Sequence, residues 1–407
     1  MLNRRLFFFS PVPPAKTGTA TYLFSLLPPD CYPPPNTYFI INCEDYQKPP
    51  HEFLGVPCIN YDDVRLKPND ISVFFIANNE FHQYIIAYLK KPKIGRYILW
   101  IHEPQIFQNM LGMALNNKFQ YTLKDLEEAL KPEFGYLASQ IINDIQKGNF
   151  ENFFTYTILC LKDVLEKSDL IVTHSIYAKL KLLLESGTYR NIPPILVAKH
   201  PEKPKNPENF YYKKVASEVF QIGIFGWVNP HKRVIEAISA FNTFWSSLPP
   251  DDKEKCILKI VGELPPKEYY DPVGFSKNLE SSHNIHFTGF LDDKDFDEEL
   301  KKTQVILNLR FPSCGESSGI LHKARGFGIP IAISDFQAFR EELSDALIPV
   351  HPEAEQKALI DFLNKTFLMW KQHKITHSII PNQNKIDKRF TAQQVLKKIY
   401  NLMEAKI

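Results

Sequence analysis

Short apolar runs separated by longer helical stretches recur along the whole chain, and no other feature constrains the fold as much. Most runs are continuous rather than alternating, which is typical of strands buried on both faces of a sheet. Alternation of strand and helix predicts parallel sheets with right-handed crossovers. Because the pattern occurs twice, it predicts an α/β protein with two Rossmann-like domains. The runs are Leu6–Phe9, Tyr38–Cys43, Val73–Ala77, Tyr97–His102, Leu170–Thr173 and Ile195–His200, then Phe220–Phe225, Ile257–Val261, Ile285–Thr288, Val305–Leu309, Ile329–Ile333 and Leu347–Val350.

The length and the charge balance limit the class of protein. At 407 residues the chain exceeds one typical core, so two domains of roughly 200 residues each are expected. The apolar fraction of 44% and the charged fraction of 23% are those of an ordinary globular protein. The 48 basic and 46 acidic side chains leave a net charge of only +2. We therefore expect no nucleic-acid partner, because nucleic-acid binders usually carry a strong basic excess.

The cysteines and the first residues bear on compartment and targeting. The six cysteines are scattered, with no CxxC pair and no Cys/His cluster at zinc spacing, so we expect no metal and a reducing cytoplasm. The apolar stretch Leu6–Phe9 is too short for a signal peptide and predicts a first strand instead. No apolar run approaches the ~20 residues that span a bilayer, so any membrane contact is expected to be peripheral.

A polar, proline-rich stretch over 201–209 predicts the linker between the domains. We place the N-terminal domain at 1–205 and the C-terminal domain at 206–385. Within the first domain, a helical insertion is expected at about 116–166, because that segment has few strand signals.

The C-terminal segment 386–407 is predicted to contain one helix that packs back towards the N-terminal domain. Val395, Ile399 and Met403 recur at helical spacing, and Thr391 suits the N-cap position.

The segment from Asn308 to Asp335 predicts a strand, a turn, a helix start and a second strand. Small residues at the helix start leave backbone amides open to phosphate oxygens, which the helix dipole also favours. Glu316 is unusual there, because a carboxylate repels phosphate. It makes sense if it binds sugar or ribose hydroxyls beside the phosphates, and the alternative is that it caps the helix. The small residues are Gly315, Ser317, Ser318 and Gly319.

The segment from Gln221 to Phe241 predicts a strand, a turn and a helix, with Lys232 and Arg233 at the turn. Two cations at such a turn can neutralise a diphosphate leaving group as charge builds on it. The alternative is that both are solvated surface cations.

Together these two segments resemble the retaining family-4 glycosyltransferases, which have the two-domain GT-B fold with a central cleft. The resemblance implies that the N-terminal domain is on the acceptor side and the C-terminal domain on the donor side. Residues Gly315–Gly319 look like that family's Gly-Glu-Thr-Ser-Gly variant of its donor motif. Short matches in the family's order extend the resemblance over nearly the whole chain. They are Ser10–Pro14, Gly18–Tyr22, Asn78-Asn79, His82, His102–Pro104, His174-Ser175 and His200-Pro201.

The resemblance implies a role for each matching residue. Lys232 would contact the donor diphosphate with Arg233 as its helper, and Glu316 would bind donor hydroxyls. His102 would face the donor sugar near the bond being broken, which makes His102, Lys232 and Glu316 the catalytic candidates. The other donor-binding candidates are Gly18 and Thr19 in the opening loop, Ser317, Ser318 and Gly319 on the phosphates, and Gly289 and Phe290 near the base.

The chain departs from the family pattern at two positions, and the roles of the histidines have to be weighed one by one. Many members carry an arginine where this chain has Trp227, and a second glutamate where it has Ala324. His174 and His200 end predicted strands, and we expect structural roles for both. His82 suits either a functional or a structural role. Of the histidines, we therefore keep only His102 as a functional candidate, because it ends a strand at the ligand-binding face of an open α/β sheet.

The resemblance implies a cytoplasmic, metal-independent transferase without a cofactor. It would move a sugar, with retention, from a nucleotide-diphosphate donor to a glycan or lipid-linked glycan, with room for peripheral contact at the inner membrane face. Two alternatives stay open: another sugar-nucleotide reaction such as epimerisation, and a catalytically silent scaffold. The acidic pairs Asp62-Asp63 and Asp292-Asp293 are interpreted as solvated turns.

Overall fold

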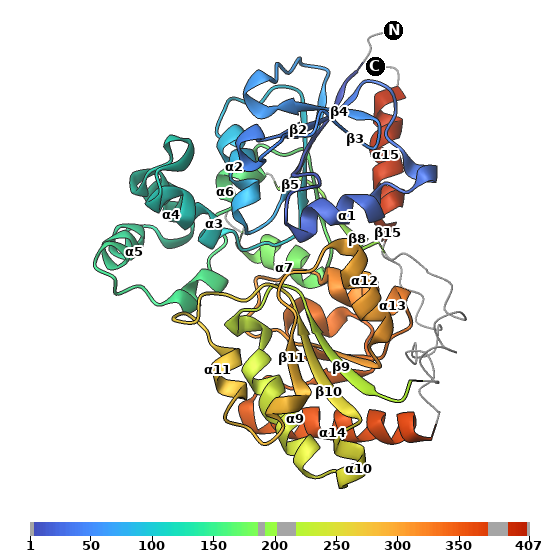
Figure 1. The fold of residues 1–407 in the computed structure, drawn as a ribbon. Helices are drawn as coiled ribbons and strands as arrows, with labels where there is room; N and C mark the ends of the chain where they lie inside the picture. Colours follow the sequence, from blue (N-terminus) through green and yellow to red (C-terminus); the bar gives the residue numbers. More distant parts are fainter. Residues whose placement is uncertain (1–3, 186–191, 202–216, 373–389, 405–407) are drawn as a thin grey trace. The chain divides into compact units, whose positions relative to one another are not determined.

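The computed structural model describes residues 4–185, 192–201, 217–372 and 390–404 (Figure 1). Contacts divide the chain into two compact units. Unit 1 comprises Met1–Pro201, Cys314–Ser317 and Lys388–Ile407, and unit 2 comprises Glu202–Ser313 and Ser318–Asp387. The predicted boundaries after residues 205 and 385, and most of the predicted linker, lie outside the described residues.

Unit 1 is built on a sheet with the strand order β15-β8-β7-β6-β5-β1-β2-β4-β3. Neighbouring strands are parallel, except that β3 and β4 form an antiparallel pair. The strands are β1 (Leu6–Phe9), β2 (Thr37–Ile41), β3 (Glu52–Phe53), β4 (Val56–Asn60), β5 (Ile71–Ile76), β6 (Arg96–Ile101), β7 (Leu170–Thr173), β8 (Ile195–Lys199) and β15 (Phe390–Thr391).

Unit 2 contains a fully parallel sheet with the order β11-β10-β9-β12-β13-β14. Numbered from its own first strand this order is 3-2-1-4-5-6, the Rossmann arrangement. The strands are β9 (Phe220–Phe225), β10 (Cys256–Val261), β11 (Ile285–Phe287), β12 (Val305–Asn308), β13 (Ile331–Ser334) and β14 (Ala346–Ile348). Each of the twelve apolar runs overlaps a strand, which confirms the predicted α/β class with two largely parallel sheets.

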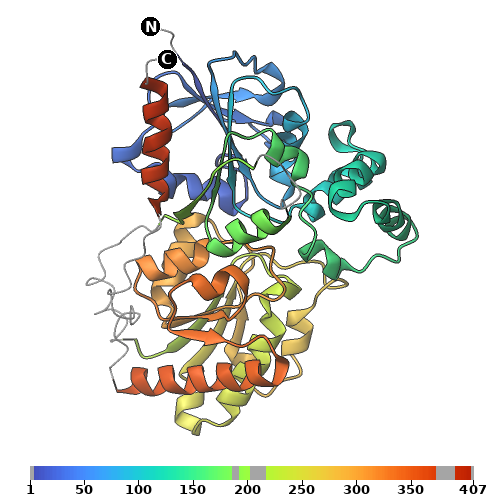
Figure 2. The same cartoon turned by 180° about the vertical axis from the view of Figure 1, so that it is seen from behind.

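Helices cover both sheets, and Figure 2 shows them from behind. In unit 1 they are α1 (Gly18–Leu26), α2 (Gln83–Leu89), α3 (Phe107–Leu115), α4 (Leu123–Phe134), α5 (Leu137–Gln146), α6 (Lys162–Glu166), α7 (Ile176–Glu185) and α15 (Ala392–Glu404). In unit 2 they are α9 (Val234–Ser246), α10 (Pro250–Lys253), α11 (Pro272–Ser276), α12 (Asp293–Lys302), α13 (Gly319–Gly326) and α14 (Pro352–Lys371). Within unit 1, α4 and α5 project away from the sheet (Figures 1 and 2).

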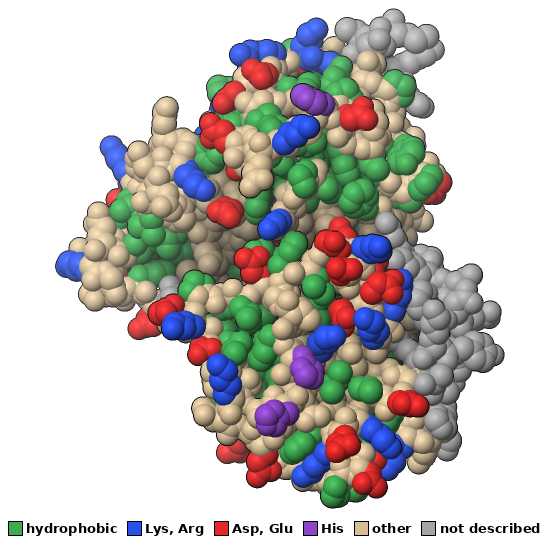
Figure 3. All heavy atoms as spheres, viewed as in Figure 1, with side chains coloured by type: hydrophobic (Ala, Val, Ile, Leu, Met, Phe, Trp, Pro, Cys, Tyr) green, Lys and Arg blue, Asp and Glu red, His purple; other side chains and the backbone are tan. Residues whose placement is uncertain are grey.

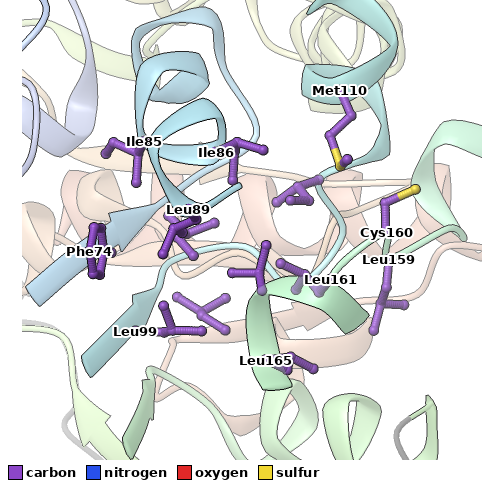
Figure 4. Packing of buried hydrophobic residues seen from close by; sticks show 14 of the residues in the cluster. Phe74, Ile85, Ile86, Leu89, Leu99, Met110, Leu159, Cys160, Leu161 and Leu165 are labelled. Atoms are coloured by element: carbon purple, nitrogen blue, oxygen red, sulfur yellow. The ribbon is translucent and has the colours of Figure 1, made fainter. Parts of the chain in front are cut away.

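Both faces of the unit 1 sheet are buried, which explains the unbroken apolar runs. Phe7 and Phe9 belong to one hydrophobic cluster, and Leu6 and Phe8 belong to the cluster on the opposite face. Figure 4 shows the first cluster, in which side chains of β5, β6 and α2 meet Met110 of α3 and residues in and just before α6. Each fully buried side chain of this size contributes roughly 1.5–3 kcal/mol, so the two faces together hold the sheet.

Helix α15 packs against the second of these clusters. Val395 and Ile399 are buried there beside Leu6 and Phe8. The predicted N-cap is confirmed, because Thr391 Oγ1 accepts a 3.1 Å hydrogen bond from the amide of Gln394. The side-chain oxygen of Gln394 in turn accepts a hydrogen bond from the amide of Thr391. This reciprocal capping fixes where the helix begins.

Candidate functional site

Each unit has one point where the strand order reverses. In unit 2 the reversal lies at β9, which pairs with β10 on one side and β12 on the other. In unit 1 it lies at β1, which pairs with β2 and β5. Open α/β sheets bind ligands beyond the carboxyl ends of the strands at such a point. The segments that follow β9, β12, β1 and β5 are therefore the first places to look for a site.

Lys232 follows β9 and is buried, with 8% of its surface exposed. Its Nζ lies 3.5 Å from the carbonyl oxygen of Phe225, the last residue of β9. A Cβ added to Gly226 would lie 2.6 Å from Lys232 Nζ and 3.9 Å from Cγ1 of Ile320, in the first turn of α13. The ammonium group and the start of α13 therefore lie close together. This burial excludes the solvated-surface interpretation of Lys232.

Arg233 has different surroundings from its neighbour. Its backbone is left-handed, with φ of 56°, at the junction between the turn and α9. Its Nε donates to Glu355 Oε1 at 3.0 Å, and its Nη1 lies 2.9 Å from Glu236 Oε1. Glu355 belongs to α14 and is 1% exposed. Two carboxylates of unit 2 thus hold this guanidinium, and its contact with a diphosphate stays a prediction.

Helix α13 begins at the carboxyl end of β12, and Ser318 is its N-cap. The Ser318 hydroxyl accepts from the amide of Leu321 at 3.3 Å and from the side-chain amide of Asn308 at 3.0 Å. These bonds tie the helix start to the end of β12. A Cβ at Gly319 would meet no atom within 4 Å. The first amides of a helix have no intrahelical partner, so an anion could approach there beside Lys232.

Glu316 lies two residues before this cap. Its Oε2 accepts a 2.8 Å hydrogen bond from the amide of Cys314, and the first turn of α13 holds no acidic residue. The helix-capping alternative is therefore wrong, because Ser318 fills that position. Gly315 precedes Glu316 with φ of +75°, and a Cβ there would lie 2.9 Å from Cγ of Pro104. Only glycine suits that point of the loop.

Gly289 and Phe290 follow β11, two strands away from the reversal point. Gly289 has φ of 70° and forms a bridge with Gly262, which follows β10. The ring of Phe290 is 48% exposed. An exposed aromatic ring at the carboxyl edge of the sheet offers a flat apolar surface to a planar ligand group.

In unit 1 the opening loop leads into α1. Gly18 is the first residue of that helix, and a Cβ there would meet no atom within 4 Å, so the fold itself does not require glycine. Thr19 Oγ1 lies 2.8 Å from Nε2 of His82, and Nδ1 of that histidine lies 2.7 Å from the carbonyl oxygen of Phe75. Burial lowers the pKa of His82 to about 4, so its imidazole is neutral near pH 7.

Three further histidines meet around the ring of Tyr22. His102, His174 and His200 follow β6, β7 and β8, which are neighbours in the sheet. Their ring centroids lie 4.7, 5.5 and 4.9 Å from that of Tyr22. Burial, together with the nearby histidines, lowers the pKa of His102. The sequence did not reveal this cluster, although histidines at three successive strand ends were a visible signal.

Among the residues that the structure describes, no group of three or more His, Cys, Asp or Glu is arranged to hold a metal ion. No helix there is long and apolar enough to cross a bilayer. In the view of Figure 3, acidic and basic side chains are interspersed over unit 2, as the small net charge suggests.

The likeness to known proteins lies in the fold. No family model and no curated protein sequence matches the chain. Among solved structures it is similar to Anabaena HepE in complex with UDP and glucose, with a TM-score of 0.55 and 13% identity, covering 99% of this chain and 100% of that one. It is also similar to sucrose-phosphate synthase of Thermosynechococcus elongatus, with a TM-score of 0.60 and 12% identity over 98% of both chains. A UDP-forming trehalose-phosphate synthase of Burkholderia xenovorans has a TM-score of 0.59 and 9% identity, covering 99% and 100%. These glycosyltransferases have the GT-B fold, and this chain shares it.

Proposed function

We propose that the chain is a glycosyltransferase that takes a sugar from a nucleoside-diphosphate donor. The observation that carries this proposal is the buried ammonium group of Lys232 beside the first turn of α13, at the strand-order reversal of unit 2. A helix start is the complementary partner for phosphate oxygens.

In this proposal the diphosphate is the leaving group. Negative charge builds on its oxygen as the bond to the sugar breaks, and Lys232 and the amides of Ser317, Ser318 and Gly319 stabilise that charge. Groups that are already in place and shielded from water do this better than solvated groups. We propose that this fixed cation serves without a metal ion and that transfer retains the anomeric configuration, as the family resemblance implies.

Other residues would bind the rest of the donor. The exposed ring of Phe290, next to Gly289, suits stacking on the nucleotide base. Glu316 would accept hydrogen bonds from sugar hydroxyls, and these are stronger to a carboxylate than to a neutral group. His102 would face the sugar. At Gly18 a side chain has room within the protein, so a need for glycine there would come from a ligand.

The donor class has further support from the structural neighbours. One is in complex with UDP and glucose, and another is named as UDP-forming. We therefore propose a uridine nucleotide sugar as the first donor to test. We assign the acceptor, a glycan or lipid-linked glycan, to unit 1, with a cytoplasmic location and peripheral contact at the membrane.

The decisive assay measures release of nucleoside diphosphate from a panel of nucleotide sugars, with and without candidate acceptors. Transfer predicts release that depends on the acceptor and falls in Lys232→Ala but not in Lys277→Ala, which removes an exposed lysine of the same unit. A new sugar nucleotide formed without an acceptor would indicate epimerisation instead. No binding and no turnover with any donor would indicate a scaffold.

A further inference from the structure

Three groups form a continuous hydrogen-bonded chain at the carboxyl ends of β6, β7 and β8. The carbonyl oxygen of Ala198 lies 3.0 Å from Nδ1 of His174. Nε2 of His174 lies 3.1 Å from Nδ1 of His102. Trp100 joins at the middle, because its indole Nε1 donates to His174 Nε2 at 3.4 Å. His174 and Trp100 are both buried, with 3% and 0% of their surface exposed.

The Ala198 carbonyl and the Trp100 indole together determine which group donates in each of these hydrogen bonds. A carbonyl oxygen only accepts, so Nδ1 of His174 carries a proton. An indole nitrogen only donates, so Nε2 of His174 is an acceptor and the ring is neutral. That nitrogen has one lone pair, which it shares between Trp100 at 3.4 Å and His102 at 3.1 Å, so His102 donates to it from its own Nδ1. In a neutral His102 the remaining nitrogen, Nε2, then has a lone pair and no proton.

The Nε2 atom of His102 is the last polar atom in this series of hydrogen bonds. It is shielded from solvent and has no hydrogen-bond partner among the residues that the structure describes. Burial and the neighbouring histidines lower the pKa of His102, which keeps the ring neutral. A buried acceptor without a partner is costly, so a ligand that supplies a donor would be favoured there.

We propose that His174 is a positioning residue that holds His102 in its Nδ1–H form, so that His102 Nε2 accepts a hydrogen bond from a hydroxyl of the donor sugar. This inference rests on the proposed function. It adds a restriction on the ligand, because an acceptor nitrogen attracts a hydroxyl and repels a carboxylate. At that position a neutral hexose is preferred over the corresponding uronic acid or deoxy sugar.

The surrounding structure holds the geometry in place. The ring of Tyr22 lies edge-on to His102, with 84° between the ring planes, and Phe75 stacks on His102 at 5.9 Å. His82 repeats the same device, since its Nδ1 bonds the Phe75 carbonyl and its Nε2 accepts from Thr19. In both cases the carbonyl oxygen of a strand residue fixes the tautomer of a histidine. That histidine then orients a predicted site residue, His102 in one case and Thr19 in the other.

The tautomer can be measured directly in the ligand-free full-length protein. Long-range ¹H–¹⁵N correlation spectra of ¹⁵N-histidine-labelled protein at pH 7 distinguish the two neutral forms, and His102→Gln assigns the signal. We expect His102 as Nδ1–H. An Nε2–H or imidazolium pattern in the unsubstituted protein would overturn the inference, whatever the enzymatic activity proves to be.

A matched pair of variants tests the role of His174. His174→Gln places an amide oxygen near the former Nε2 and should restore the acceptor for His102. His174→Asn reaches only the Ala198 carbonyl and leaves His102 without that acceptor. We expect kcat/KM for the donor within a few fold of normal in the Gln variant and about tenfold lower in the Asn variant, as for one lost hydrogen bond.

A donor lacking the contacted hydroxyl separates positioning from a purely structural role. In the unsubstituted protein one member of a deoxy-sugar series should lose about tenfold in kcat/KM, and that loss should vanish in His174→Asn. Equal losses in both proteins, or equal activity of the Gln and Asn variants, would contradict the proposal. No turnover with any nucleotide sugar would defeat the proposed function, while the spectra would still decide the tautomer.

Discussion

The imidazole of His82 links the segment after β5 to the first turn of α1, because its Nε2 accepts a 2.8 Å hydrogen bond from the hydroxyl of Thr19. Its Nδ1 donates to the carbonyl oxygen of Phe75 at 2.7 Å. Both ring nitrogens are therefore used by a neutral ring that has no exposed surface. Protonation would turn Nε2 from an acceptor into a donor and break the hydrogen bond to α1.

This link predicts a loss of stability in mild acid. The pKa of His82 falls from 6.5 to about 4 on folding, so the unfolded chain binds the proton more readily. Stability is then fully present above pH 6.5 and declines as the pH falls towards 4, by at most roughly 3 kcal/mol. Urea unfolding between pH 4 and 7.5 measures this slope. His82→Gln should flatten it, whereas His51→Gln, at an exposed site, should not; equal slopes in all three would contradict the assignment.

Lys232→Ala should remove most turnover. Losing a fixed donor to developing charge typically lowers the rate by roughly 10²–10³. Steady-state kinetics with the preferred donor measures the effect, and circular dichroism checks that the fold is intact. Lys277→Ala is the control. Near-normal turnover in Lys232→Ala would show that its ammonium group does not act on the leaving group.

Glu316→Gln should lower activity steeply and hardly change the melting temperature. The amide keeps one hydrogen bond to a hydroxyl but loses the charge-assisted bonds, which are about twice as strong. Stability should change little through the helix, because Ser318 and not the Glu316 carboxylate is the N-cap of α13. Full activity together with a lowered melting temperature would exclude a donor-binding role.

Arg233→Ala should affect stability more than Lys232→Ala does. It would leave Glu355, which is 1% exposed, without the partner that faces it. Breaking a buried ion pair from one side typically costs about 3–5 kcal/mol. Thermal or urea unfolding measures the loss, and Arg233→Ala combined with Glu355→Ala should recover part of it. An unchanged melting temperature with weakened nucleotide binding would instead make Arg233 a diphosphate ligand.

The strands were predictable because their signal is local. Phe7 and Phe9 point to one face and Leu6 and Phe8 to the other, so burial on both faces leaves an unbroken apolar run. The β3–β4 pair was missed, since Pro57 and two polar residues interrupt the pattern around it. Strand β15 was missed because two residues carry no periodicity.

The chemistry of the site was only partly predictable, because it depends on partners far apart in sequence. Lys232 was visible as a residue type at a turn, but its closeness to the start of α13, far along the sequence, has no local signal. The pairing of Arg233 with Glu355 joins two helices and has no local signal. For His174 the sequence predicted a structural role. The hydrogen bonds that fix its tautomer come from Trp100 and Ala198, on the two strands that flank β7.

Binding of a nucleoside diphosphate tests the central claim most directly. Thermal shift with UDP, GDP, ADP and dTDP at millimolar concentration should raise the melting temperature for at least one of them. A ligand at a hundredfold excess over its Kd stabilises the fold by about 2.7 kcal/mol. Lys232→Ala should lose most of this shift, and Lys277→Ala should keep it. No shift with any diphosphate, or an equal shift in both variants, would contradict a diphosphate site at Lys232.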